Sequence, residues 1–163
     1  MIKNSNFTFD ITKRGIRNGI LVRTFDVHDE AAAALPALAQ LRKMLSHEFA
    51  FFVLAPETQK ELYSSLDFTA GFIGFESANK VLSRETLLEI RKLRFGAGIV
   101  FNNSFCDALC MRLAGIPSVY GFADGMKRIV FTKAFDRSLY PSDRTEQLLQ
   151  MVYALGAPIQ EQH

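Results

Sequence analysis

The residues best suited to chemistry form a polar corner, Asn102-Asn103-Ser104, directly after the apolar run Ala97–Phe101. Such a run is typical of a buried strand in a parallel sheet, and open α/β sheets bind their ligands at the carboxyl ends of their strands. Amide and hydroxyl groups can hydrogen-bond a polyol, but they cannot by themselves break a covalent bond. Asn103 and Ser104 are also good N-cap residues for a helix that starts at Phe105, and the two roles are compatible.

A second polar group follows the first strand-like run, Gly19–Val22, and places Asp26, His28, Asp29 and Glu30 within five positions. Asp29 or Glu30 could act as general base for a hydroxyl nucleophile that lies within hydrogen-bond distance. The alternative is that these carboxylates only complement the dipole of a helix N-terminus. Asp26, His28 and Glu30 have the composition of a divalent-metal site, but we predict no metal there.

The loop after the first strand also excludes two common nucleotide sites. A dinucleotide site needs glycines here for close approach to the pyrophosphate, and residues 23–30 contain none. A kinase-type phosphate loop is missing from the sequence as well. Cys106 and Cys110 are spaced i, i+4 on one predicted helix with no histidine nearby in sequence. We expect both to be buried free thiols, which indicates a reducing compartment.

A formal net charge of +2 over 163 residues gives no indication of nucleic-acid binding. The basic residues nevertheless form an early and a late cluster: Lys13, Arg14 and Arg17, and Lys127, Arg128, Lys133 and Arg137. These clusters either form a solvated surface or face an anionic ligand or membrane. No apolar run has the length of a membrane span and the first residues lack a signal-peptide core, so we expect a cytoplasmic protein.

Strand-like and helix-like patterns alternate along the chain. We expect strands at residues 19–22, 49–54, 68–75, 97–101, 118–122 and 129–132. We expect helices over residues 31–45 with an interruption at Pro36, from 55 to about 66, over 84–94 and 105–113, and from an Asp143 cap to about 155. This alternation predicts repeated βαβ units and one α/β domain, with a doubly wound, mostly parallel, Rossmann-like sheet.

Several ordered segments resemble the amino-terminal half of the bacterial ADP-heptose–lipopolysaccharide heptosyltransferases, which form glycosyltransferase family 9. The likeness is greatest to the heptosyltransferase II type and runs from Gly19 to about Pro158. The segments are Ile20–Arg23 leading to Leu35–Leu38, then Val53–Pro56, then Asn103-Ser104-Phe105 followed by Ala114–Pro117 and Gly121.

The resemblance implies a two-domain transferase of the GT-B architecture. Its amino-terminal Rossmann-like domain binds the acceptor, the phosphorylated inner core of lipopolysaccharide, and its carboxyl-terminal domain binds ADP-heptose. The family's Gly-Asp pair, whose Asp is the base, corresponds to Asp29 and Glu30 when counted back from Pro36. Ala123 stands where related sequences often carry Arg.

The resemblance also assigns roles to residues of this chain. Glu30, or Asp29, would take the acceptor proton. Asn103 and Ser104 would position the polyol. The two cations that would pair with the acceptor phosphate are Lys127 and Arg128.

We therefore expect residues 1–163 to be a single acceptor-type domain without the donor domain, inactive alone and binding no cofactor itself. ADP-heptose would serve as donor only when a carboxyl-terminal-type domain is supplied. Expected partners are the phosphorylated inner core and a donor domain or second copy, with no nucleic acid. Contact with the inner membrane would be peripheral, at its cytoplasmic face.

Two other classes of protein remain open from the sequence. One is a non-catalytic glycan- or protein-binding module derived from a glycosyltransferase. The other is a flavodoxin-like or response-regulator domain, which explains the alternation of strands and helices but not the segment Asn103-Ser104-Phe105 with Gly115-Ile116-Pro117.

Overall fold

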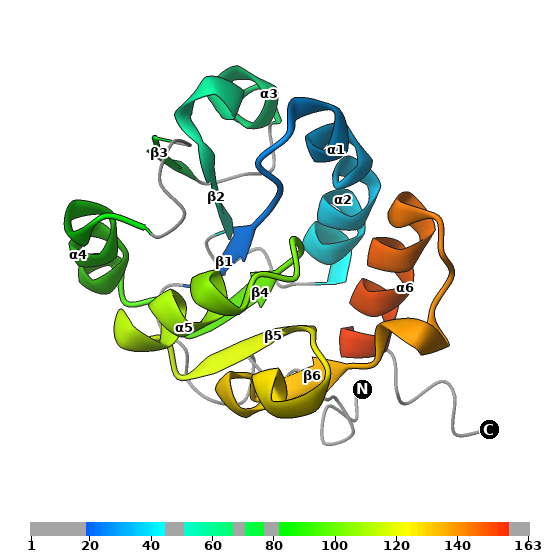
Figure 1. The fold of residues 1–163 in the computed structure, drawn as a ribbon. Helices are drawn as coiled ribbons and strands as arrows, with labels where there is room; N and C mark the ends of the chain where they lie inside the picture. The colour runs from blue at the N-terminus through cyan, green and yellow to red at the C-terminus, as the bar shows by residue number, and fades with distance from the viewer. Residues whose placement is uncertain (1–18, 45–50, 67–70, 77–81, 157–163) are drawn as a thin grey trace.

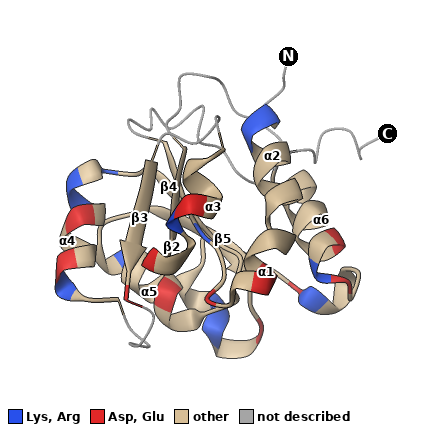
Figure 2. Ribbon diagram, turned by 90° about the horizontal axis from the view of Figure 1, so that it is seen from above, with Lys and Arg blue, Asp and Glu red and all other residues tan. Residues whose placement is uncertain are grey.

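The computed structural model of the chain describes residues 19–44, 51–66, 71–76 and 82–156. This described part forms a six-stranded parallel sheet between two layers of helices (Figure 1). Figure 2 shows the charged residues mainly on the helices and the connecting loops. The strands are β1 Ile20–Arg23, β2 Phe51–Pro56, β3 Gly71–Phe75, β4 Ala97–Val100, β5 Ser118–Phe122 and β6 Lys133–Phe135.

The strand order, β3-β2-β1-β4-β5-β6, places a topological switch point between β1 and β4. Ile20 of β1 lies opposite Phe51 of β2 on one side and Ala97 of β4 on the other. The chain winds outward from β1 to β3 and then returns past β1 to β4. The loops after β1 and β4 therefore leave the sheet in opposite directions and leave a crevice between them. The predicted α/β, doubly wound, Rossmann-like fold is confirmed.

Side chains of each strand alternate between two apolar cores, one on each face of the sheet. Ile20 and Val22 of β1 pack in one core, and Leu21 packs in the other. The first core is covered by α1 His28–Ala33, α2 Leu35–Met44, α3 Lys60–Ser64 and α6 Arg144–Gly156. The second is covered by α4 Arg84–Leu93 and α5 Phe105–Leu113. A sheet with both faces covered explains why its strands are continuous apolar runs.

Three local signals in the sequence fix helix boundaries as predicted. The Ser83 hydroxyl accepts a hydrogen bond from the backbone N–H of Thr86 and caps α4. The Asp143 carboxylate accepts one from the N–H of Glu146 at 3.0 Å and caps α6. Pro36 lies in the first turn of α2, where a backbone N–H would have no partner within the helix, so its absence costs nothing. The predicted interruption of the helix lies just before Pro36, between the end of α1 and the start of α2.

Three predicted boundaries are wrong. Ala55 and Pro56, expected to open a helix, are the last residues of β2, and the helical segment starts at Glu57. Residues 129–132 are not a strand: Gly125–Val130 form a short 3₁₀ helix, η3, and β6 starts only at Lys133. Gly125 has a φ of 57°, a left-handed conformation that opens this tight turn. The first helix starts at His28 rather than residue 31, because the chain turns directly after β1 and places the acidic residues in the first helical turn.

The prediction of two buried thiols is right for Cys110 and wrong for Cys106, which is exposed on α5. Burial raises the pKa of the Cys110 thiol, so it stays protonated at neutral pH. Both cysteines are free. The early basic cluster, Lys13, Arg14 and Arg17, lies outside the described residues.

We predict that Leu38→Ala lowers the free energy of unfolding by about 2–5 kcal/mol, because Leu38 is fully buried between α2 and the sheet. Urea denaturation followed by circular dichroism measures this change. Leu113→Ala is the control: its side chain is 62% exposed, and the change should stay within about 0.5 kcal/mol. Equal losses in the two variants would contradict the packing described.

Candidate functional site

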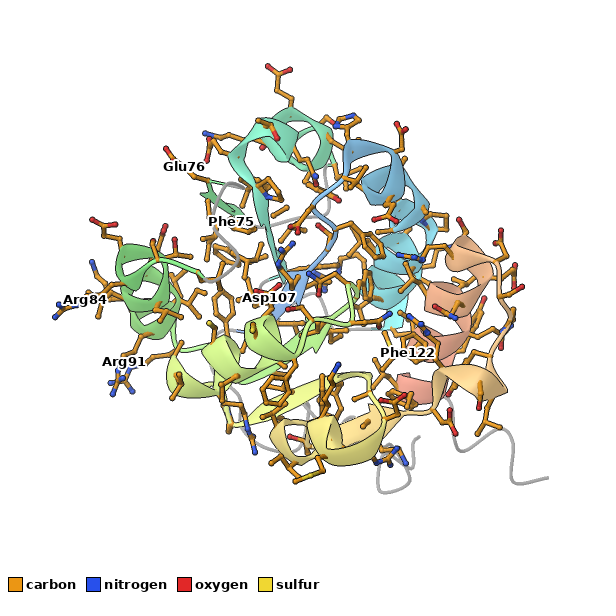
Figure 3. The ribbon with its side chains drawn as sticks, viewed as in Figure 1. Phe75, Glu76, Arg84, Arg91, Asp107 and Phe122 are labelled. Atoms are coloured by element: carbon orange, nitrogen blue, oxygen red, sulfur yellow. The ribbon has the colours of Figure 1, made fainter. Side chains whose placement is uncertain are left out.

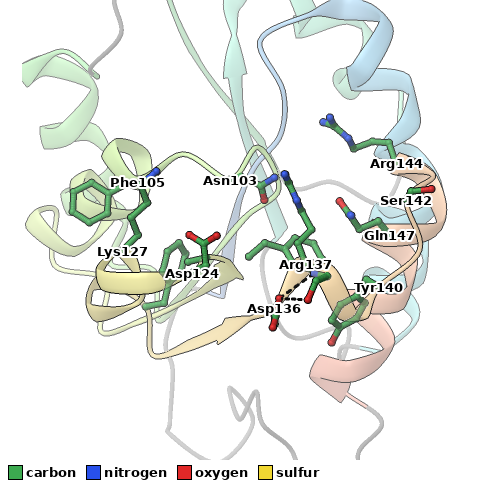
Figure 4. A pocket seen from close by; sticks show the side chains of 14 residues that line it. Asn103, Phe105, Asp124, Lys127, Asp136, Arg137, Tyr140, Ser142, Arg144 and Gln147 are labelled. Atoms are coloured by element: carbon green, nitrogen blue, oxygen red, sulfur yellow. Dashed lines mark hydrogen bonds between the residues drawn. The ribbon is translucent and has the colours of Figure 1, made fainter.

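A cleft lies along the carboxyl edge of the sheet and has two neighbouring parts. The smaller part, about 550 Å³, lies at the switch point between the loops after β1 and β4. The larger part, about 870 Å³, lies beyond β5 and β6 (Figure 4). Asn103, Arg137 and Arg144 line both parts, so we treat the two parts as one cleft. The two polar groups singled out in the sequence therefore meet here, since Asp26, Glu30 and residues 102–104 all line the smaller part.

A buried ion pair holds the two loops of the switch point together. The Nε of Arg23 donates to Oδ2 of Asp107 at 2.8 Å, and their side chains are only 3% and 5% exposed. The guanidinium also donates to Asp26 at 2.5 Å and lies 4.7 Å above the ring of Phe75. The Nδ2 of Asn102 donates to the same Asp107 oxygen at 2.9 Å. Figure 3 shows Asp107 in the middle of the molecule, where α5 meets the end of β1.

Arg23 and Asp107 were missed as site residues in the sequence. A signal was present, because Arg23 is a charged residue directly at the end of a buried strand. A charge at that position needs a partner when it is buried. Nothing in the spacing identified Asp107 as that partner, since the two residues are separated by 84 positions.

The three residues of the polar corner, Asn102, Asn103 and Ser104, have different hydrogen-bond roles. Asn102 Oδ1 accepts from the N–H of Ser104 at 3.1 Å, and Ser104 Oγ accepts from the N–H of Asp107 at 3.1 Å, which caps α5. Asn103 has a φ of 62°, and its Oδ1 is buried without a hydrogen-bond partner among the described residues. Ser104 therefore serves as the helix cap, whereas the Asn103 amide oxygen is left without a partner among the described residues.

Gln59, in the short 3₁₀ helix η2 (Glu57–Gln59) that follows β2, holds the loop after β1 by hydrogen bonds to its backbone. Its Nε2 donates to the carbonyl oxygens of Phe25 at 2.9 Å and of Asp26 at 3.0 Å. The side chain is fully buried, so these bonds are shielded from water. No sequence pattern indicates this role, because a polar residue in a short helix usually faces solvent.

The carboxylates after β1 take different positions. Glu30 lines the smaller part of the cleft, is 44% exposed, and lies 3.7 Å from the guanidinium of Arg144. Arg144 in turn stacks on the ring of Phe25, 4.9 Å from its centre. Asp26 also lines the cleft. Asp29 is exposed and lines neither part. A catalytic role for Glu30 or Asp29 stays a prediction, and geometry places only Glu30 of the two in the cleft.

Cations line the larger part of the cleft, although not all of those predicted. Lys127 lies there, whereas Arg128 lines neither part. Arg137 and Arg144 line both parts. Arg137 belongs to the late basic cluster, for which an anionic ligand was one alternative, whereas Arg144 was not singled out in the sequence. Hydroxyl- and amide-bearing side chains line the same part of the cleft among these cations (Figure 4): Asn103, Ser138, Tyr140, Ser142 and Gln147.

Acidic groups moderate this positive field. The side chain of Ser138 donates to Asp136 at 2.7 Å and its backbone N–H donates at 3.0 Å. These two bonds lower the pKa of Asp136, which stays ionised at neutral pH. Asp124 lines the same part of the cleft. The described residues contain no group of three or more histidine, cysteine or carboxylate side chains placed to hold a metal ion.

The strand order and the cleft define the class: a Rossmann-like α/β domain with a cleft at the switch point. No family model matches the sequence, and no curated protein matches it in a sequence search. Solved structures do share the fold. It superposes on ADP-heptose lipopolysaccharide heptosyltransferase II of E. coli with a TM-score of 0.69 at 22% identity, covering 86% of this chain and 42% of that one.

Two further structures agree. E. coli heptosyltransferase WaaC with ADP gives a TM-score of 0.69 at 10% identity, covering 85% of this chain and 46% of that one. A glycosyl transferase of family 9 from Veillonella parvula gives 0.69 at 16%, covering 85% and 42%. The chain thus has the α/β fold of a heptosyltransferase-type glycosyltransferase domain, and it spans less than half the length of these three proteins. That share is consistent with an amino-terminal domain.

We predict that Asp107→Leu destabilises the protein by about 3–5 kcal/mol, because it removes the buried carboxylate that pairs with the Arg23 guanidinium and leaves only the exposed Asp26. The second single variant is Arg23→Met. The double variant Arg23→Met/Asp107→Leu removes both charges and should lose much less. Urea denaturation of the wild type, both single variants and the double variant measures the coupling. Additive losses would contradict a direct interaction between the two side chains.

Proposed function

We propose that this chain is the acceptor-binding domain of a heptosyltransferase-type glycosyltransferase that acts on the phosphorylated inner core of lipopolysaccharide. One observation carries the proposal: the cleft along the carboxyl edge of the sheet brings together cations, hydroxyl- and amide-bearing side chains and a carboxylate. Lys127 and Arg137 have no ion-pair partner among the described residues, so both are available to an anionic group. The fold shared with heptosyltransferases supports the same function.

Each residue of the cleft would have its own role in binding the acceptor or in transferring the proton. Asn103 Oδ1 accepts a hydrogen bond from an acceptor hydroxyl, and Lys127 and Arg137 pair with the acceptor phosphate. Glu30, oriented by Arg144, takes the proton of the attacking hydroxyl. The new bond forms between that oxygen and the anomeric carbon of the donor, and ADP leaves with the bonding electrons.

The donor nucleotide sugar would be bound by a second domain. The heptosyltransferases with this fold are about twice as long as the part that this chain covers. The chain would therefore bind no cofactor itself, and transfer would require a donor-type domain. We place the protein in the bacterial cytoplasm, peripherally at the inner membrane where a lipid-linked acceptor lies. No helix among the described residues is both long and apolar enough to span a bilayer.

A second candidate is a glycan-binding module without catalysis. The placement of the carboxylates favours it, because Asp29 does not line the cleft and the Glu30 carboxylate lies 3.7 Å from the Arg144 guanidinium. Binding of the acceptor is common to both functions. Only a transfer assay with a donor domain separates them.

We predict that titration with phosphorylated inner-core oligosaccharide moves the backbone amide resonances of Asn103, Ser104 and Glu30. Arg137→Gln should weaken binding about tenfold, because it removes a charge-assisted hydrogen bond to phosphate. Arg91→Gln is the matched control, since Arg91 is an exposed cation on α4 that points away from the cleft (Figure 3). The dephosphorylated oligosaccharide should bind equally to wild type and Arg137→Gln. No movement at any of the three amides would refute the acceptor site.

We predict that the isolated chain transfers no heptose from ADP-heptose, and that a heptosyltransferase donor domain added in trans restores transfer. With that domain, Glu30→Gln should lower the rate about a hundredfold or more, since it removes the base. Asp29→Asn, one position away and outside the cleft, should leave the rate nearly unchanged. Transfer by the chain alone would contradict the proposal. Restored transfer that is insensitive to Glu30→Gln would exclude Glu30 as the base.

A further inference from the structure

The Asp26 carboxylate, in the loop after β1, is held from two sides and still lines the cleft. The Nη2 of Arg23 donates to its Oδ1 at 2.5 Å, and the Nε2 of Gln59 donates to the backbone carbonyl oxygen of Asp26 at 3.0 Å. The side chain is nevertheless 60% exposed and lines the smaller part of the cleft. A carboxylate that is fixed before a ligand arrives loses little conformational freedom when it binds one.

The cation that holds Asp26 is itself anchored in the interior of the domain. Arg23 is only 3% exposed and donates through Nε to the buried carboxylate of Asp107 at 2.8 Å. Its Nη1 donates to the carbonyl oxygen of Thr24 at 3.3 Å, and its guanidinium lies 4.7 Å from the centre of the Phe75 ring. All three guanidinium nitrogens are therefore in use, and the position of Asp26 Oδ1 is set by buried contacts rather than by the surface of the loop.

The other oxygen of this carboxylate, Oδ2, is open to a ligand. Among the described residues, Oδ2 of Asp26 has no hydrogen-bond or ion-pair partner of its own. An ionised carboxylate accepts hydrogen bonds and donates none, so its ligand must supply donors. Hydroxyl groups and cationic nitrogen groups are the two kinds of ligand that meet this requirement.

The charges around the smaller part of the cleft favour a neutral, hydroxyl-bearing ligand. Three basic and three acidic side chains line it: Arg23, Arg137 and Arg144, and Asp26, Glu30 and Asp107. Since these charges balance, the smaller part attracts neither an anion nor a cation strongly. The larger part is lined by three basic and two acidic side chains, and neither Asp26 nor Glu30 is among them. A phosphorylated sugar would thus place its phosphate in the larger part, beside Lys127 and the Arg137 of η4 (Arg137–Leu139), and its hydroxyl groups in the smaller one.

We propose that Asp26 selects the acceptor sugar: its carboxylate accepts hydrogen bonds from two hydroxyl groups on neighbouring carbons of one sugar ring. This inference rests on the proposed acceptor function and names the chemical group that the smaller part of the cleft recognises. Two hydroxyl groups match the lone pairs that Oδ2 leaves free, and hydrogen bonds to an ionised acceptor are stronger than neutral ones. A sugar that lacks either hydroxyl would shield the carboxylate from water without satisfying it, which is how a polar site rejects such an analogue.

Titration calorimetry of the intact chain with phosphorylated and with dephosphorylated inner-core oligosaccharide tests this contact. Asp26→Asn should weaken the binding of both forms about tenfold, because the amide nitrogen that replaces Oδ2 cannot accept a hydrogen bond. Arg137→Gln, in contrast, should weaken the binding of the phosphorylated form alone. Glu89→Gln is the matched control, since Glu89 is an exposed carboxylate on α4 that lines neither part of the cleft.

The direction of the change separates a direct hydrogen bond from a general effect of charge. Asp26→Asn removes one negative charge, and long-range electrostatics alone would then strengthen the binding of a phosphorylated ligand. Weaker binding therefore requires contact between the carboxylate and the sugar. The variant keeps an oxygen that can accept from Arg23, and circular dichroism should show the native fold. Unchanged or tighter binding in Asp26→Asn would overturn the inference.

Monodeoxy analogues of the oligosaccharide test the same contact without altering the protein. We expect two of them, which lack hydroxyl groups on neighbouring carbons, to bind the wild type about tenfold more weakly, and Asp26→Asn to discriminate against neither. Absence of any analogue with this pattern would contradict the proposed contact.

Transfer kinetics with a donor domain added separate selection of the sugar from catalysis. Asp26→Asn should raise the acceptor KM and leave kcat nearly unchanged. A lower kcat at unchanged KM would make Asp26 the base and overturn its role in selection. Oligosaccharide binding that Asp26→Asn leaves intact refutes the role of Asp26 alone, whereas no binding by the wild type refutes the proposed acceptor function together with this inference.

Discussion

The ion pair between Arg23 and Asp107 is the contact on which the site depends. It joins the end of β1 to the first turn of α5, and so it spans the switch point where the two loops diverge. Asn102 and Asp26 are bound to the same pair, which fixes the polar corner and the start of the α1 loop relative to each other. A buried ion pair adds little net stability compared with apolar packing, but it is sensitive to the geometry of its partners. Its value here is to position the loops rather than to hold the domain together.

The sequence predicted the fold because local and tertiary signals agree in this chain. The strands are uninterrupted apolar runs, the helices carry Ser83 and Asp143 as caps, and Pro36 marks the division between α1 and α2. The prediction of a strand at residues 129–132 was wrong, because a short apolar run of this length is compatible with a strand and with a 3₁₀ turn. The left-handed Gly125 opens the turn, and only at Thr132 does the chain reach hydrogen bonds to Val119 of β5, just before β6 starts.

The site was predicted only in part, because several of its residues reach the cleft through tertiary packing that the sequence pattern does not show. Residues next to a strand end, such as Asn103 and Glu30, can be placed at the carboxyl edge from the strand pattern alone. Arg137 and Arg144 reach the cleft from η4 and α6, after the last strand, and that return path depends on how α6 packs against α2. Gln59 acts through bonds to backbone carbonyl oxygens on another loop, which no spacing rule reveals. The sequence shows the chemistry available, and the sheet topology determines which groups share one cleft.

The central claim is that one cleft binds a phosphorylated sugar between Asn103 and the cations of η3 and η4. The most direct test is a crystal structure of the chain with a phosphorylated inner-core disaccharide. We predict a sugar hydroxyl within hydrogen-bond distance of Asn103 Oδ1, with the phosphate between Lys127 and Arg137 and the attacking hydroxyl facing Glu30. A disaccharide bound elsewhere, or one in this cleft with its phosphate turned away from both cations, would contradict the account.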